Sequence, residues 1–134
     1  MGTPGGAVCR YGLPVIRRVV IALCNPVPWA PPGIDRQRWR AALAEDVVDL
    51  LAMMHEVQPA VGAVAADRPM VDDLVWPGMP VYDLPEPTVG AALDAAAADG
   101  YDQAAVIAAD APDVPGLILA KLLRPLTPRP VAVA

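Results

Sequence analysis

Apolar residues gather into two nearly uninterrupted runs, and both are typical of strands buried on two faces. The first run covers 15–23, is rich in β-branched side chains, and contains only Arg17 and Arg18 as polar positions. The second covers 103–109 and ends at Asp110. Strands of a parallel sheet are covered by helices on both faces, so they carry continuous apolar runs rather than strict alternation. The two runs therefore predict parallel strands that lie close together in one sheet.

Helical periodicity is clearest in 37–56, where apolar residues recur every three or four positions. These apolar positions are Trp39, Leu43, Val47, Leu50, Leu51 and Met54. Pro59 follows and predicts that the helix has ended by that point. A second helix is predicted over the Ala-rich segment 89–98, with Thr88 as its N-cap and Gly100 at its C-terminal cap.

Proline and short apolar stretches divide the rest of the chain. Four prolines make 25–33 a stiff loop, and the polar stretch 68–78 predicts irregular structure. Short apolar stretches predict further strands at 60–65, at 79–84 and starting at 131–134. Strands that alternate with helices in this way predict an α/β, Rossmann-like three-layer domain with a mostly parallel sheet. Ligands of such sheets bind beyond the carboxyl ends of the strands.

Length and composition favour one globular domain. The chain has 134 residues, of which 55% are hydrophobic, so we expect a flexible tail over 1–14 and a single α/β domain over 15–134. The net charge of −5 argues against a nucleic-acid partner and against a membrane surface, because both need concentrated Lys and Arg. Cys9 and Cys24 do not form a CxxC pair, which favours a reduced, cytoplasmic setting.

The acidic turn after the second apolar run carries the strongest candidate chemistry. Asp110 ends that run, and Asp113 follows it across Pro112. Carboxylates at the carboxyl end of a strand face the crevice of the sheet, where they could bind Mg²⁺ or Mn²⁺. The same residues also suit ordinary turn chemistry, with Asp113 as the N-cap of a helix predicted over 114–123. Both interpretations stay open, with Asp110 and Asp113 as candidate metal ligands.

Other candidates for chemistry are weaker. Arg36, Arg38 and Arg40 form either a phosphate-binding patch or simply the solvated start of the first helix. The chain contains no serine and neither cysteine has a clear partner, so nothing indicates Ser-His-Asp or Cys-His catalysis. Further residues that are more simply explained by surface, loop or partly buried positions are Asp72, Asp73, His55, Trp29 and Trp76.

The segment 98–115, Ala-Asp-Gly-Tyr-Asp-Gln-Ala-Ala-Val-Ile-Ala-Ala-Asp-Ala-Pro-Asp-Val-Pro, resembles the central motif of the DUF2064 family. Proteins of that family are similar to GT-A glycosyltransferases and to nucleotidyltransferases of the nucleotide-diphospho-sugar transferase superfamily. Their motif is a helix, a Gly-Tyr step, an apolar strand and then Asp-x-Pro-Asp-hydrophobic-Pro. Looser similarity extends over 17–134. The resemblance implies that Asp110 is the carboxylate for the metal or the nucleotide diphosphate, and that the loop after the first strand cradles the nucleotide.

The sequence departs from this family at two places. The loop after the first strand lacks the usual Gly and Lys-Thr-Arg-Leu-like cluster, and only Arg36 and Arg38 stand in as basic residues for binding the nucleotide. The family also continues into a Gly-rich acceptor-side segment where this chain ends, which predicts a domain incomplete at its C-terminus and an uncovered face closed by homo-oligomerisation. Two functions remain: a GT-A-like transferase domain that binds a nucleotide or nucleotide sugar through Mg²⁺ or Mn²⁺, and a non-catalytic relic that acts as a binding domain.

Overall fold

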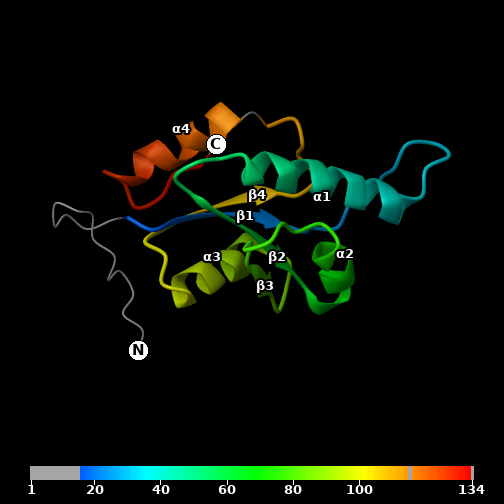
Figure 1. The fold of residues 1–134 in the computed structure, drawn as a ribbon, viewed down its shortest axis with the longest axis horizontal. Coiled ribbons are helices and arrows are strands. Elements are labelled where there is room, and N and C mark those ends of the chain that lie inside the picture. Colours follow the sequence, from blue (N-terminus) through cyan, green and yellow to red (C-terminus); the bar gives the residue numbers. More distant parts are fainter. Residues whose placement is uncertain (1–15, 115, 134) are drawn as a thin grey trace.

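Four parallel strands form the sheet, in the order β3-β2-β1-β4, and helices connect them (Figure 1). The computed structural model describes residues 16–114 and 116–133. The strands are β1 (Arg18–Leu23), β2 (Gln58–Ala63), β3 (Val81–Asp83) and β4 (Gln103–Ala108). The helices are α1 (Arg36–Ala52), α2 (Arg68–Asp72), α3 (Val89–Ala98) and α4 (Gly116–Leu123), with 3-10 turns η1 (Ala65–Asp67) and η2 (Arg124–Leu126).

The two apolar runs pair with each other, as their sequences predict. In the β1–β4 pair Leu23 lies opposite Ala108, and in the β1–β2 pair Leu23 lies opposite Gly62. The side chains of 19–24 are buried, which fits a central strand covered on both faces. Because the three strands are parallel and in this register, they end at the same edge of the sheet. The loops that follow them are therefore brought together there.

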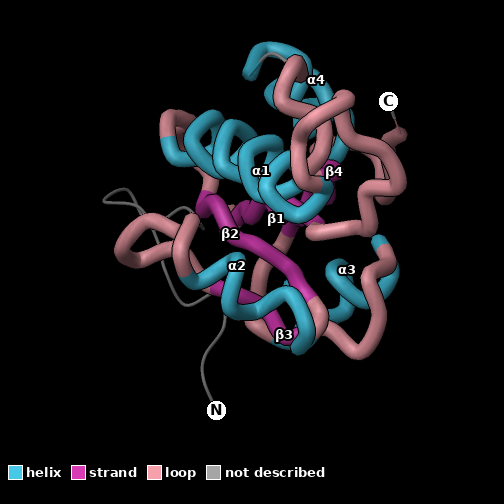
Figure 2. Tube along the Cα trace, turned by 90° about the vertical axis from the view of Figure 1, so that its right-hand side faces the viewer, coloured by secondary structure: helices cyan, strands magenta, loops and turns pink. Residues whose placement is uncertain are grey.

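Each face of the sheet packs against its own helices, giving three layers (Figure 2). On one face Val20 and Ala22 pack in a core with buried residues of α1 and α4, among them Leu51 and Leu119. On the other face Val19, Ile21 and Leu23 pack with Leu84 and with two alanines of α3. The small side chains of α3 let this helix approach the sheet closely. The α/β class, the layering and the parallel sheet are thus confirmed.

Local capping explains where the two longer helices begin. The Asp35 side chain accepts a hydrogen bond from the backbone N–H of Arg38 at 3.0 Å and caps α1. Thr88 caps α3 in the same way, by accepting from the N–H of Ala91 at 3.2 Å, which confirms its predicted role. Gly100 follows α3 with φ +85°, a left-handed conformation that glycine adopts without strain, and this confirms its predicted position.

Several predicted boundaries are wrong. α1 ends at Ala52 rather than at 56, since the chain turns there and Glu56 takes a positive φ of 68°. The stretch 68–78 is not wholly irregular, because it begins with α2. Pro69 stands in the first turn of α2, where its missing N–H costs nothing and its fixed φ suits a helix.

The C-terminal predictions also need correction. α4 begins at Gly116 rather than at 114, so Asp113 does not stand immediately before the helix that it was predicted to cap. Residues 131–133 form no strand, and Val131 and Val133 are 72% and 91% exposed. Pro128 and Pro130 come just before this segment and lack the N–H groups that a ladder needs.

Two further points concern the limits of the described chain. The predicted tail 1–14 lies outside the described residues, as do Pro115 and Ala134. Among the helices of the part that is described, none combines the length and the apolar character needed to cross a bilayer.

Candidate functional site at the carboxyl edge of the sheet

The sheet has a topological switch point between β1 and β4. From β1 the chain adds β2 and then β3 on one side, and it later returns to add β4 on the other side of β1. The strand order therefore reverses between β1 and β4, while α1 and α4, which follow these two strands, pack on the same face of the sheet. Open parallel sheets bind ligands beyond the carboxyl ends of strands where the order reverses, which makes this edge the place to look for a site.

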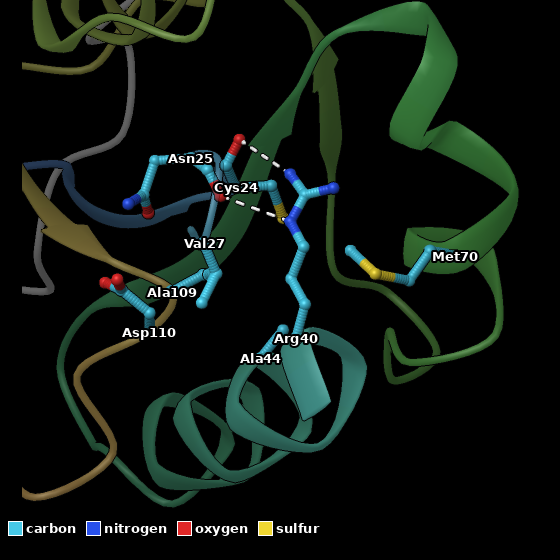
Figure 3. A pocket seen from close by; sticks show the side chains of 8 residues that line it. All are labelled: Cys24, Asn25, Val27, Arg40, Ala44, Met70, Ala109 and Asp110. Carbon is cyan, nitrogen blue, oxygen red and sulfur yellow. Dashed lines mark hydrogen bonds between the residues drawn. The ribbon is translucent and has the colours of Figure 1, made fainter. Parts of the chain in front are cut away.

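The residues that follow β4 and β1 continue the hydrogen-bond ladder of the sheet at this edge. The N–H of Ala109 donates to the carbonyl of Leu23 at 2.9 Å, and the N–H of Cys24 donates to the carbonyl of Gly62 at 2.9 Å. A small hollow lies over them, lined by Cys24, Asn25, Val27, Arg40, Ala44, Met70, Ala109 and Asp110 (Figure 3). Its lining side chains are packed so closely that the space left for a water-sized sphere is about 0 Å³. Pockets that hold drug-sized molecules usually measure about 300–1,000 Å³, so the hollow is too small to enclose a whole nucleotide.

Asn25 lines this hollow and has an unpaired side-chain oxygen. Its Oδ1 atom is buried and has no hydrogen-bond partner, whereas its Nδ2 donates to the carbonyl of Pro26 at 3.4 Å. A buried amide oxygen without a partner is uncommon, because losing its hydrogen bonds to water costs free energy. The half-buried Asp110 lines the same hollow. In Figure 3 its carboxylate and the Asn25 amide both lie away from the guanidinium of Arg40.

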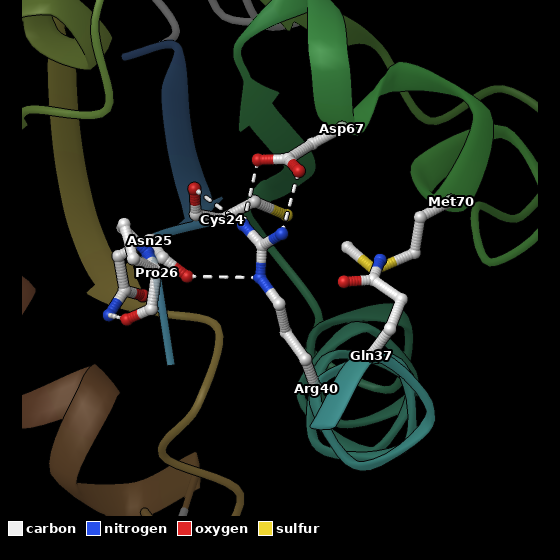
Figure 4. A network of polar contacts seen from close by, with 7 residues as sticks. All are labelled: Cys24, Asn25, Pro26, Gln37, Arg40, Asp67 and Met70. Atoms are coloured by element: carbon white, nitrogen blue, oxygen red, sulfur yellow. Dashed lines mark hydrogen bonds and ion pairs between the residues drawn. The ribbon is translucent and has the colours of Figure 1, made fainter. Parts of the chain in front are cut away.

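Arg40 holds the opposite side of the hollow together. Its Nη1 and Nη2 donate to the two carboxylate oxygens of Asp67 at 2.6 and 2.7 Å (Figure 4). Its Nε donates to the carbonyl of Asn25 at 3.2 Å, and Nη2 donates to the carbonyl of Cys24 at 3.5 Å. The Arg40 and Asp67 side chains are only 13% and 15% exposed. The hydrogen bond to Asp67 is the main reason that the pKa of Arg40 is raised, so this guanidinium stays charged.

The thiol of Cys24 is not a reactive nucleophile near neutral pH. Burial is the main cause that raises its pKa to about 11, against a smaller lowering effect from the charge of Arg40. Nucleophilic cysteines need a thiolate near neutral pH. Cys24 therefore contributes a small apolar wall to the hollow rather than a nucleophile.

The predicted site residues are only partly brought together. Asp110 lines the hollow, whereas Asp113 is exposed on the turn beyond it. Arg36 and Arg38 are both exposed in the first turn of α1. They are two residues apart, about 200° around the helix, so they cannot both face one ligand. Arg40, grouped with them in the sequence, is instead committed to Asp67.

The weaker candidates take structural or surface positions. Asp72 pairs with Arg68 at 2.8 Å on an exposed face of α2, and His55 is exposed. The indole N–H of Trp76 donates to Asp49 at 2.9 Å. Trp29, which is 61% exposed, meets Trp39 edge to face, with ring centroids 6.3 Å apart. Within 16–114 and 116–133, no group of three or more His, Cys, Asp or Glu side chains is placed to hold a metal.

A second, more open groove lies beyond β3 at the beginning of α3. It has about 520 Å³ of space for water-sized spheres. The residues that line it are Asp83, Leu84, Pro85, Glu86, Thr88, Gly90, Ala91, Asp94 and Ala95. Three of them are acidic, so this groove repels phosphate.

The sequence did not reveal Asn25 as a candidate ligand or Arg40 and Asp67 as a pair. Asn25 is the second residue after β1, just as Asp110 is the second residue after β4, and this rule could have found it. The pairing of Arg40 with Asp67 spans 27 residues and depends on how η1 packs beside α1. No local pattern encodes such a contact.

No family model, curated protein or solved structure matches this chain. The resemblance to the DUF2064 family therefore depends on the quoted motif and stays a prediction, as do the GT-A type of the fold and a homo-oligomeric state.

Proposed function

We propose that this domain binds the diphosphate of a nucleotide or nucleotide sugar through Mg²⁺ or Mn²⁺, as a GT-A-like transferase domain would. One observation carries the proposal: Asp110 and Asn25, whose Oδ1 has no hydrogen-bond partner, both line the hollow at the carboxyl edge of the sheet. A bound cation would give Asn25 the partner that its buried oxygen lacks.

The donor set fits a hard divalent cation. Carboxylate and amide oxygens are ligands that Mg²⁺ and Mn²⁺ prefer, and Mg²⁺ usually takes only one or two carboxylates besides phosphate and water. The hollow as it stands has no space for a water-sized sphere, so a cation would bind at its mouth or after its lining side chains move apart, and the nucleotide would lie outside it. The bound cation would neutralise charge that develops on a leaving phosphate. Asp110 and Asn25 would hold it, and Arg40 would keep the Asn25 backbone in place.

A non-catalytic binding domain of the same fold is the second candidate. The loop 25–33 contains four prolines and so offers few N–H groups to a phosphate, and the hollow has no deep recess for a base. These features favour weak binding without turnover. Nucleotide released from UDP-sugars and GDP-sugars in the presence of Mn²⁺ separates the two, because only a transferase or hydrolase releases it.

Calorimetric titration with Mn²⁺, with and without UDP or GDP, tests the proposed site. Asp110→Asn keeps the shape of the side chain and removes its charge, so we expect Mn²⁺ affinity to fall by about tenfold or more. Asp73→Asn is the matched control, because Asp73 is exposed and lies outside the hollow. Asp113→Asn measures whether the second carboxylate of the turn takes part. Equal Mn²⁺ affinity in wild type and Asp110→Asn contradicts the proposal.

A further inference from the structure

Arg40 connects three separate parts of the chain at the candidate site. It projects from α1, donates to both carboxylate oxygens of Asp67, and donates to the carbonyls of Cys24 and Asn25. The N–H of Asn25 in turn donates to the carbonyl of Leu23 at 3.0 Å. The backbone of Asn25 is thus held at both its N–H and its C=O, which fixes the direction of its Cα–Cβ bond.

We infer that Arg40 is a positioning residue, which sets the direction of the Asn25 side chain and thereby presents Oδ1 to the cation of the proposed function. The metal-binding half of this inference rests on the proposed function, whereas the effect on the Asn25 side chain does not. A planar guanidinium suits the task, because its donors diverge in a fixed fork. Two of its nitrogens face Asp67 while Nε faces the loop. A lysine ammonium at this position has no such fixed geometry.

Asp67 has a second, electrostatic part in the arrangement. A bare guanidinium beside a cation site would repel the cation, and the repulsion would be strong because both lie away from bulk water. The two-point contact with Asp67 neutralises Arg40. The Asp110 carboxylate then remains as the uncompensated charge among the residues that line the hollow. Arg40 can therefore hold the loop without excluding a divalent cation.

The positioning effect can be measured without metal. In ¹⁵N-labelled protein, the side-chain NH₂ signals of Asn25 are identified by their loss in Asn25→Asp. We expect Arg40→Lys to shift or broaden these signals, and the matched control Arg68→Lys to leave them unchanged, because Arg68 forms exposed ion pairs elsewhere. Asp67→Asn provides a second variant if Arg40→Lys does not fold. Unchanged Asn25 signals in a folded variant overturn the inference, whatever the metal affinity.

A double-mutant cycle tests the link to the cation. We expect Arg40→Lys to weaken Mn²⁺ binding about tenfold in the wild-type background and less than twofold in the Asn25→Ala background. A purely structural role would weaken binding equally in both backgrounds, and this result overturns the inference. If wild type does not bind Mn²⁺, the proposed function fails, and the NMR comparison alone decides whether Arg40 positions Asn25.

Discussion

The hydroxyl of Tyr82 donates a hydrogen bond of 2.6 Å to Oδ2 of Asp99, and so ties β3 to the end of α3. The same turn is also held to β1, because Arg17 donates to the carbonyls of Asp99 and Gly100 and stacks over the ring of Tyr101 at 4.5 Å. These contacts lie at the amino end of β4, opposite the candidate site. They fix the entry of the chain into β4 and therefore the register that brings Asp110 to the carboxyl edge of the sheet.

Tyr82→Phe removes the hydroxyl and leaves the ring in place. We expect it to lower the free energy of unfolding by about 1 kcal/mol, the usual net value of such a hydrogen bond. The measurement is urea unfolding followed by tryptophan fluorescence. Tyr101→Phe is the control, since the ring that stacks with Arg17 is retained, and we expect a change of less than about 0.5 kcal/mol. A Tyr82→Phe protein as stable as wild type would show that the Asp99 contact contributes nothing.

The free energy of unfolding should fall in alkaline solution, and the contribution of the Cys24 thiol to this fall can be tested. Burial raises the pKa of this thiol to about 11 from 9.0, so the folded state retains a proton that the unfolded state loses. A group of this kind contributes its full stability below pH 9, and that stability is lost as the pH rises from 9 towards 11. The pKa of Tyr82 is also raised, mainly by burial, and acts in the same direction.

The measurement is urea unfolding at a series of pH values from neutral upwards. Cys24→Ala removes the thiol, so the variant should lose less stability than wild type between pH 9 and 11 while having a similar slope below pH 9. All other groups that titrate at alkaline pH are common to the two proteins, so their contributions to the free energy of unfolding cancel in the comparison. Parallel slopes over the whole range would mean that the thiol ionises equally in the folded and unfolded states.

Parts of the fold that depend on local patterns could be predicted from the sequence. The continuous apolar runs predicted β1 and β4 and their parallel pairing, because such runs are typical of strands in a covered parallel sheet. β1 is buried on both faces as predicted, whereas the edge strand β4 is only partly buried and ends at the exposed Ala108. Thr88 and Gly100 marked the ends of α3, because capping depends on neighbouring residues alone. The sequence was less informative where structure depends on distant partners. Residues 131–133 have strand-like side chains, but no strand forms there.

The candidate site, like the fold, was predicted only where it depends on local sequence patterns. Asp110 follows a buried strand, and parallel topology places such a residue at the carboxyl edge. The roles of Arg40 and Asp67 could not be predicted, because identical arginines at 36, 38 and 40 differ only in the helix face that they occupy and in what packs against it. The start of α4 at Gly116 likewise separates Asp113 from the capping position that its sequence favours.

A side chain at Gly62 in β2 should crowd two buried neighbours, Leu84 and Ile21. A Cβ atom added there would lie 3.0 Å from Cδ1 of Leu84 and 3.3 Å from Cγ2 of Ile21, and both neighbours are buried. We expect Gly62→Ala to lower the free energy of unfolding by about 1–2 kcal/mol through overpacking. Gly90→Ala in α3 is the matched control, because a Cβ there has no neighbour within 4 Å. Alanine is the better helix former, so this variant should gain about 0.5 kcal/mol. A stabilised Gly62→Ala protein would show that Leu84 moves aside at little cost.

Arg36 and Arg38 should differ in their effect on nucleotide binding, although both are exposed and both were predicted to bind the nucleotide. Arg36 lies one turn before Arg40, and residues four apart share one face of a helix. Arg40 lines the hollow, so Arg36 is on the helix face that leads to it, while Arg38 points about 200° away from Arg36. We expect Arg36→Gln to weaken the binding of Mn²⁺ with UDP or GDP by about threefold to tenfold, by removing a positive charge from the path of the diphosphate. Arg38→Gln should leave this affinity within about twofold of wild type, and neither variant should change the affinity for Mn²⁺ alone.

Both substitutions remove one charge from the same exposed helical turn, so they alter net charge and helix propensity equally. Calorimetric titrations at two salt concentrations provide the test, since a direct contact with phosphate weakens further as salt is added. Equal losses for the two variants would mean that the arginines act through net charge alone, and a larger loss for Arg38→Gln would place the nucleotide on the other side of α1.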